Sequence, residues 1–284
     1  MPTTLPGQTQ EIELPEAMCT FGTYGPNDTP YRVYSPNGEV TGSEYVLATG
    51  LLARPEQYDI LGENLALLGN RLIIFGHDHD YHKLPIRANS IDIVNGVRQL
   101  GVDEFIAVGH SMGTIAMLLA LEDPEFHKRA QALIQVNPAM TGNHLFVTPQ
   151  DLAYAEVEAL TLFATHPNKA IGYALTATDE VMHRPRVIAN QIFRLLTGKV
   201  TVRYTELMSE VPDLPVYVFY NKRDGLVPPR WGTKVKTLGR NVTVFEHDSN
   251  THLAHSAINV DPDYALALEA IAKHKKLPRS FRMI

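Results

Sequence analysis

The sequence predicts an α/β fold in which helices cover both faces of a mostly parallel sheet. Two observations support this prediction. Short apolar runs alternate with longer helical patterns over most of the chain, and strands that are apolar at every position are typical of parallel sheets buried on both faces. Near the N-terminus, the turn sequences GPND and SPNG separate β-rich segments, which indicates that several strands precede this alternation.

The individual elements follow from the same patterns. Helices are expected over residues 55–68, 86–100 and 112–121. A last helix is expected to begin at Asp261 and Pro262, a pair that is typical of a helix N-terminus. The expected strands cover residues 18–24, 31–35, 45–49, 71–75, 105–109, 132–137, 216–220 and 242–246.

The alternation stops between about residues 140 and 211. Helical patterns cover residues 149–163 and 186–196, but no core strand is evident between them. We therefore predict two parts of one core, residues 1–139 and 212–284, with residues 140–211 inserted as a helical cap above the sheet.

The composition excludes some classes of partner. The chain has 284 residues, 44% of them hydrophobic and 20% charged, and its net charge is −6. Because Lys and Arg do not cluster, we expect neither nucleic acid nor an anionic membrane as a partner. Cys19 is the only cysteine, so no internal disulfide can form. With no basic start and no apolar run at the N-terminus, a cytoplasmic protein is expected.

The strongest motif is Gly109-His110-Ser111-Met112-Gly113, which lies between an expected strand and an expected helix. A strand that turns abruptly into a helix presents the middle side chain at the carboxyl edge of the sheet. The crowded turn requires small residues two positions before and after it. The helix N-terminus also directs its amides and positive dipole end toward the serine hydroxyl. The motif therefore predicts that Ser111 is a nucleophile.

The stretch VDEFIAVGHSMGTIAMLLALEDPE resembles the nucleophile elbow of the α/β-hydrolase family, and the order of strands and helices around it is similar too. The resemblance covers most of the chain, from about Tyr31 onward. It implies an eight-stranded, mostly parallel sheet with a variable cap insertion. It also implies catalytic residues in the order Ser, Asp, His along the chain, and no cofactor.

A serine hydroxyl needs an imidazole to take its proton, and the imidazole needs a carboxylate to orient it. The resemblance places the acid after the strand at 216–220, where Asp224 lies. It places the base in the loop after the last strand, which offers His247, His252 and His255. His252 is the expected base, because it lies near the middle of that loop. His255 is the alternative if the loop has become helical.

The resemblance also implies an oxyanion hole made of two backbone N–H groups. One is that of Met112, and the other is expected from Leu51, after the strand at 45–49. The family often has His-Gly in this loop, whereas this chain has Thr49-Gly50. The Thr49 hydroxyl could face the oxyanion or brace the loop.

A second cluster, residues 77–82, contains three of the twelve histidines in the sequence HDHDYH. The spacing of His77, His79 and His82 matches part of the His-x-His-x-Asp-His metal motif of the metallo-β-lactamase fold, with Tyr81 in the place of its Asp. No other feature of that fold accompanies it. We therefore expect a polar loop near the pocket and no metal ion, with metal-assisted hydrolysis as an alternative.

The sequence thus predicts a serine hydrolase that cleaves a carboxylic ester, a lactone or a related acyl bond of a small molecule. Ser111, Asp224 and His252 would form the triad, and Leu51 and Met112 the oxyanion hole. The same fold and triad could also support carbon–carbon bond hydrolysis, acyl transfer or a lyase step. A binding protein without catalytic activity is a third hypothesis.

Overall fold

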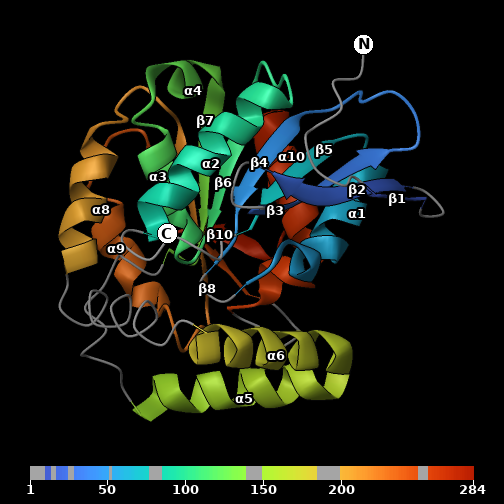
Figure 1. The fold of residues 1–284 in the computed structure, drawn as a ribbon. Coiled ribbons are helices and arrows are strands. Elements are labelled where there is room, and N and C mark those ends of the chain that lie inside the picture. Colours follow the sequence, from blue (N-terminus) through green and yellow to red (C-terminus); the bar gives the residue numbers. More distant parts are fainter. Residues whose placement is uncertain are drawn as a thin grey trace.

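The computed structural model describes residues 10–13, 17–24, 29–50, 53–76, 85–138, 149–183, 199–248 and 255–284. Over these residues the chain forms one ten-stranded sheet with helices on both sides (Figure 1). The order of strands across the sheet is β1-β2-β3-β5-β4-β6-β7-β8-β9-β10. None of the described helices is long and apolar enough to cross a membrane.

The centre of the sheet is parallel and its edges are antiparallel. The antiparallel strands are β1 (Gln10–Glu13), β2 (Ala17–Tyr24) and β3 (Thr29–Pro36) at one edge and β10 (Phe281–Met283) at the other. The parallel strands are β4 (Glu44–Ala48), β5 (Arg71–Phe75), β6 (Phe105–His110), β7 (Ala130–Val136), β8 (Val216–Asn221) and β9 (Val242–His247).

The predicted fold class is confirmed, and every expected strand is present. The sheet has two more strands than the eight expected. These are the short strands β1 and β10, which pair only at the two edges of the sheet. A strand of three or four residues that is not buried on both faces leaves no long apolar run in the sequence.

Helices cover both faces because the strands between them are apolar on both sides. One hydrophobic cluster joins one face of the sheet to α2 (Pro85–Gln99), α3 (Gly113–Ala120), α8 (Lys199–Ser209) and α9 (Gly232–Val235). The other joins the opposite face to α1 (Asp59–Leu67) and α10 (Asp263–Ala272). Shorter helices are η1 (Pro55–Tyr58), α4 (Pro124–Arg129), η3 (Pro229–Trp231) and η4 (Ala257–Asn259).

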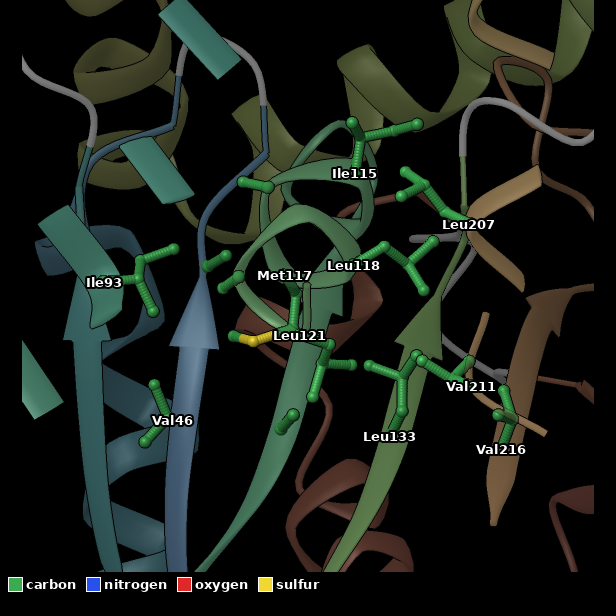
Figure 2. Close-up of a cluster of buried hydrophobic side chains, with 14 of the residues drawn as sticks. Val46, Ile93, Ile115, Met117, Leu118, Leu121, Leu133, Leu207, Val211 and Val216 are labelled. Atoms are coloured by element: carbon green, nitrogen blue, oxygen red, sulfur yellow. The ribbon is translucent and has the colours of Figure 1, made fainter. Parts of the chain in front are cut away.

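The helix that follows Ser111 is the most deeply buried of the first group. Figure 2 shows side chains of α3 packed between the strands and α8. At least seven of the eight residues of α3 are buried. Burial of an aliphatic side chain contributes about 1.5–3 kcal/mol, so this packing fixes the start of α3, and with it Ser111, relative to the sheet. The labelled residues are Val46, Ile93, Ile115, Met117, Leu118, Leu121, Leu133, Leu207, Val211 and Val216.

Two long helices, α5 (Pro149–Thr165) and α6 (Pro167–His183), lie within the residues predicted to form the cap. Figure 1 shows them side by side and apart from the sheet. The prediction found α5 but not α6 or α8, and the expected helix over residues 186–196 lies outside the described residues. Although α8 precedes residue 211, it packs on the core beside α3. The division at residues 140 and 211 stays a prediction.

Candidate active site

Ser111 lies at the turn between β6 and α3 and has a left-handed backbone conformation, with φ of +51°. Such a conformation is uncommon for a residue with a side chain. The two glycines of the motif permit the turn. A Cβ atom on Gly109 would lie 2.5 Å from the Cα atom of Thr114, and one on Gly113 would lie 2.2 Å from the carbonyl oxygen of Ala48. The requirement for glycine at these positions follows from backbone contacts.

Asp224 follows β8 and is almost completely buried. Its Oδ1 atom accepts the backbone N–H groups of Leu226, at 2.8 Å, and Val227, at 2.7 Å. Its Oδ2 atom lies 2.9 Å from Nδ1 of His255. Each carboxylate oxygen therefore has a partner, and the carboxylate holds an imidazole as a triad acid would.

The histidine beside Asp224 is thus His255, the alternative that the sequence left open. The expected base, His252, lies outside the described residues, so its assignment stays a prediction. His247 is fully buried and bonds to Asn221 through Nδ1, at 2.6 Å. His255 sits in a turn directly before η4, and the preceding residues 249–254 lie outside the described residues.

The backbone of His255 is held as firmly as its ring. Its N–H group donates to Oε2 of Glu158 at 2.9 Å. Its carbonyl oxygen lies 3.1 Å from Nε2 of His110 and accepts from the side-chain amide of Asn137 at 3.3 Å. With Nδ1 on Asp224, the remaining polar atom of His255 is Nε2, which is the atom needed to exchange a proton with a serine.

His110 links the three loops of the site. Its Nε2 atom must carry the proton, because the His255 carbonyl can only accept. Its Nδ1 atom then accepts from the Tyr58 hydroxyl at 2.7 Å, and the Tyr58 oxygen accepts the N–H of Gly50 at 3.1 Å. A continuous chain of hydrogen bonds thus runs from the loop after β4, through the residue before Ser111, to His255.

The pKa values of the two neighbouring histidines, His110 and His255, are shifted in opposite directions. Burial and the nearby His255 lower the pKa of His110 to about 3, so this ring is neutral at pH 7. Burial also lowers the pKa of His255, but the charge and hydrogen bond of Asp224 and the charge of Glu158 outweigh it, so the pKa is raised. A raised pKa makes this imidazole a stronger proton acceptor.

Glu158 is a buried carboxylate that comes from α5. Its Oε2 atom accepts the N–H of His255, and its Oε1 atom accepts the N–H of Ser256 at 2.7 Å. Burial and the charge of Asp224 raise the pKa of its carboxyl group. Through these two bonds, α5 is attached directly to the segment that carries His255.

The loop after β4 passes close to Ser111, as the expected oxyanion hole requires. A Cβ atom on Gly50 would lie 3.3 Å from Cβ of Ser111. Met112 directly precedes α3, where the first N–H groups of a helix have no partner within it. Leu51 lies outside the described residues. Thr49 is fully buried, and its hydroxyl has no hydrogen-bond partner among the described residues.

Sequence reasoning missed Tyr58, Asn137 and Glu158 and gave no role to His110. Only His110 had a usable signal, because it lies inside the motif. The other three lie 52, 118 and 97 residues from their partners, and nothing in the sequence relates them. The cluster at residues 77–82, with the proposed His77 and His79, lies outside the described residues.

No family model and no curated protein matches this chain by sequence. Solved structures do match over nearly its whole length. Cfl2 from Burkholderia cenocepacia is 13% identical, with a TM-score of 0.62, and the match covers 94% of this chain and 98% of that one. A bromoperoxidase from Bacillus anthracis is 13% identical, with a TM-score of 0.58, over 87% and 97% of the two chains.

A third similar structure is an α/β-hydrolase enzyme from a sediment metagenome of the lagoon of Mar Chica, Morocco. It is 16% identical, with a TM-score of 0.53, and the match covers 89% of this chain and 98% of that one. Identities this low establish architecture and leave the reaction open. Together with the strand order and the elbow at Ser111, they show that this chain has the α/β-hydrolase fold.

Proposed function

We propose that the protein is a serine hydrolase that cleaves a carboxylic ester, a lactone or a related acyl bond of a small molecule. Ser111 is the nucleophile, His255 the base and Asp224 the acid, so that His255 replaces the expected His252. One observation carries the proposal. Among the described residues, every polar group of His255 except Nε2 has a partner. Its Nδ1 atom lies 2.9 Å from the buried Asp224 carboxylate, and its carbonyl oxygen lies 3.1 Å from Nε2 of His110, the residue before Ser111.

The chemistry follows from these positions. Oγ of Ser111 attacks the carbonyl carbon while Nε2 of His255 accepts the hydroxyl proton, and the carbonyl oxygen becomes an oxyanion. The N–H groups of Met112 and Leu51 are proposed to hold that oxyanion. Cleavage of the acyl bond transfers the proton from His255 to the leaving group, and an acyl-enzyme remains. Water then attacks the acyl carbon while His255 accepts its proton. The bond from that carbon to Oγ of Ser111 breaks, Oγ takes the proton from His255, and the acid is released.

A matched set of variants tests the proposal. Ser111→Ala should abolish labelling by a fluorophosphonate probe and turnover of a chromogenic ester. His255→Gln should lower kcat by at least about 10³-fold, because removal of a triad member disables the unit. His252→Gln should leave kcat within a few-fold of wild type. If the effects of the two histidine variants are exchanged, His252 is the base. Labelling that persists in Ser111→Ala excludes Ser111 as the nucleophile.

A further inference from the structure

A second buried imidazole lies at the end of β9, outside the proposed catalytic machinery. His247 is fully buried, and its Nδ1 atom lies 2.6 Å from Oδ1 of Asn221, which also accepts the hydroxyl of Tyr264 at 3.0 Å. An amide oxygen only accepts, so Nδ1 carries the proton. In the neutral ring Nε2 therefore presents a lone pair, and this buried atom has no hydrogen-bond partner among the described residues.

Aromatic rings fix the direction of that lone pair. Phe281 stacks on the His247 imidazole, with ring centroids 4.3 Å apart and planes 21° apart. Tyr264 meets it edge to face at 4.9 Å. The imidazole therefore cannot turn Nε2 toward another partner without displacing Phe281 or Tyr264.

Nε2 of His247 faces two carboxylates at the start of α10. It lies 3.6 Å from Oδ2 of Asp261. His247, Asp261 and Asp263 each offer one possible ligand atom, and these three atoms all lie within 4.8 Å of one another. A separation of 3.6 Å is too long for an N–H···O hydrogen bond. It fits two ligands of one ion, because bonds of about 2.0–2.1 Å at an angle of about 110–120° place their ends about 3.4–3.6 Å apart.

The surrounding groups hold the carboxylates as outer-shell partners do at metal sites. Oδ1 of Asp261 accepts the N–H of Asp263 at 3.0 Å, and Oδ2 of Asp263 accepts the Ser280 hydroxyl at 2.6 Å. A third carboxylate near His247 is that of Asp248. Its Oδ2 atom accepts from Nζ of Lys222 at 2.9 Å.

From this geometry we infer that His247, Asp261 and Asp263 form a binding site for a divalent transition-metal ion such as Zn²⁺ or Mn²⁺. One imidazole nitrogen and two carboxylate oxygens suit such ions. The ligands stand on either side of residues 248–260 in the sequence, the stretch that carries His255. A bound ion would join the end of β9 to the start of α10 and so stabilise that stretch. The role is structural, and the ion takes no part in the proposed acyl chemistry.

The test measures metal binding on the full chain carrying Ser111→Ala, so its outcome does not depend on catalysis. His77→Ala and His79→Ala are added, because the cluster at 77–82 could bind metal independently. Calorimetric titration of the chelator-treated protein with Zn²⁺ and Mn²⁺ should show one saturable site, and Tm should rise with metal concentration.

Asp263→Asn should weaken that binding by at least about tenfold and abolish most of the Tm shift. Asp263 is half-buried, so this variant should fold. Asp248→Asn is the matched control, since it removes a neighbouring negative charge without removing a ligand, and it should bind like the parent. Binding that is absent in the parent, or equal in the parent and Asp263→Asn, would overturn the inference. So would ¹⁵N NMR showing both His247 nitrogens protonated and unchanged by Zn²⁺.

Discussion

At the residue scale, the site depends on side chains that hold His255 in one orientation. Asp224 fixes its ring, while His110 and Asn137 hold its carbonyl group. In the proposed mechanism Nε2 is the atom that transfers the proton, and an imidazole held in this way does not need to reorganise during the reaction. The left-handed conformation of Ser111 is permitted by Gly109 and Gly113, since a Cβ atom on either residue would clash with neighbouring backbone atoms.

Thr49 offers a test at this scale, because its buried hydroxyl has no partner among the described residues. An unsatisfied buried polar group costs about 1–3 kcal/mol. Thr49→Val should therefore raise the free energy of unfolding, by about 1 kcal/mol. If the hydroxyl donates to the oxyanion, kcat should fall, on the order of 100-fold, with little change in KM.

Urea denaturation and ester kinetics measure the two effects separately. Thr49→Ser retains the hydroxyl and is the control for activity. An unchanged kcat in Thr49→Val would leave the hydroxyl no role in the oxyanion hole, and a loss of stability would show that it bonds in the folded protein.

Prediction from sequence succeeded at this scale where the requirement is local. The elbow is readable because its glycines contact backbone atoms within a few residues or in the adjacent strand. The choice among His247, His252 and His255 is different, because it depends on which imidazole reaches a carboxylate 31 or fewer residues away. Spacing alone favoured His252, and the contact between His255 and Asp224 appears only in three dimensions.

At the scale of elements, the strands were predictable and several helices were not. Apolar runs identify β4 to β9, because strands buried on both faces leave a continuous signal. The helix α8 has polar residues on its outer face, and its buried residues Tyr204, Leu207 and Met208 recur at helical spacing. That pattern was present in the sequence, but it lay within the segment interpreted as cap.

Glu158 connects two elements, the helix α5 and the turn before η4, and this connection can be tested. Glu158→Gln places an N–H donor where a carboxylate oxygen now accepts a backbone N–H. We expect kcat to fall about tenfold or more, because His255 loses part of its support. The acid limb of the pH profile of kcat/KM should also move to lower pH, since the charge of Glu158 helps to raise the pKa of His255.

Glu156→Gln is the matched control, because it removes an exposed carboxylate from the same helix. It should change neither kcat nor the pH profile. A lower kcat in Glu158→Gln without movement of the acid limb would mean that Glu158 acts only by holding the backbone.

At the scale of the whole molecule, the same network makes stability depend on pH. The chain of bonds from Gly50 through Tyr58 and His110 to His255 joins the loops after β4, β6 and β9. It requires a neutral His110, because Nδ1 must accept from Tyr58. Protonation of this buried ring would remove the acceptor of the Tyr58 hydroxyl proton and place a charge in the core.

We therefore expect acid to destabilise the fold through His110. The folded pKa is about 3, well below the value of about 6.5 for an unfolded chain. Between these values the unfolded state binds a proton that the folded state does not, so the free energy of unfolding falls as pH falls, by up to roughly 1.4 kcal/mol per pH unit. This contribution to stability is fully present above about pH 6.5.

His110→Gln removes the titrating ring and retains one donor and one acceptor. Urea denaturation of wild type and variant at several pH values between 7 and 4 should give a shallower loss of stability for the variant, although its stability at pH 7 is lower. Groups away from the site, such as His247 and the surface carboxylates, contribute equally to both proteins and cancel in the difference. Parallel pH curves for the two proteins would mean that His110 is not the group that couples folding to acid.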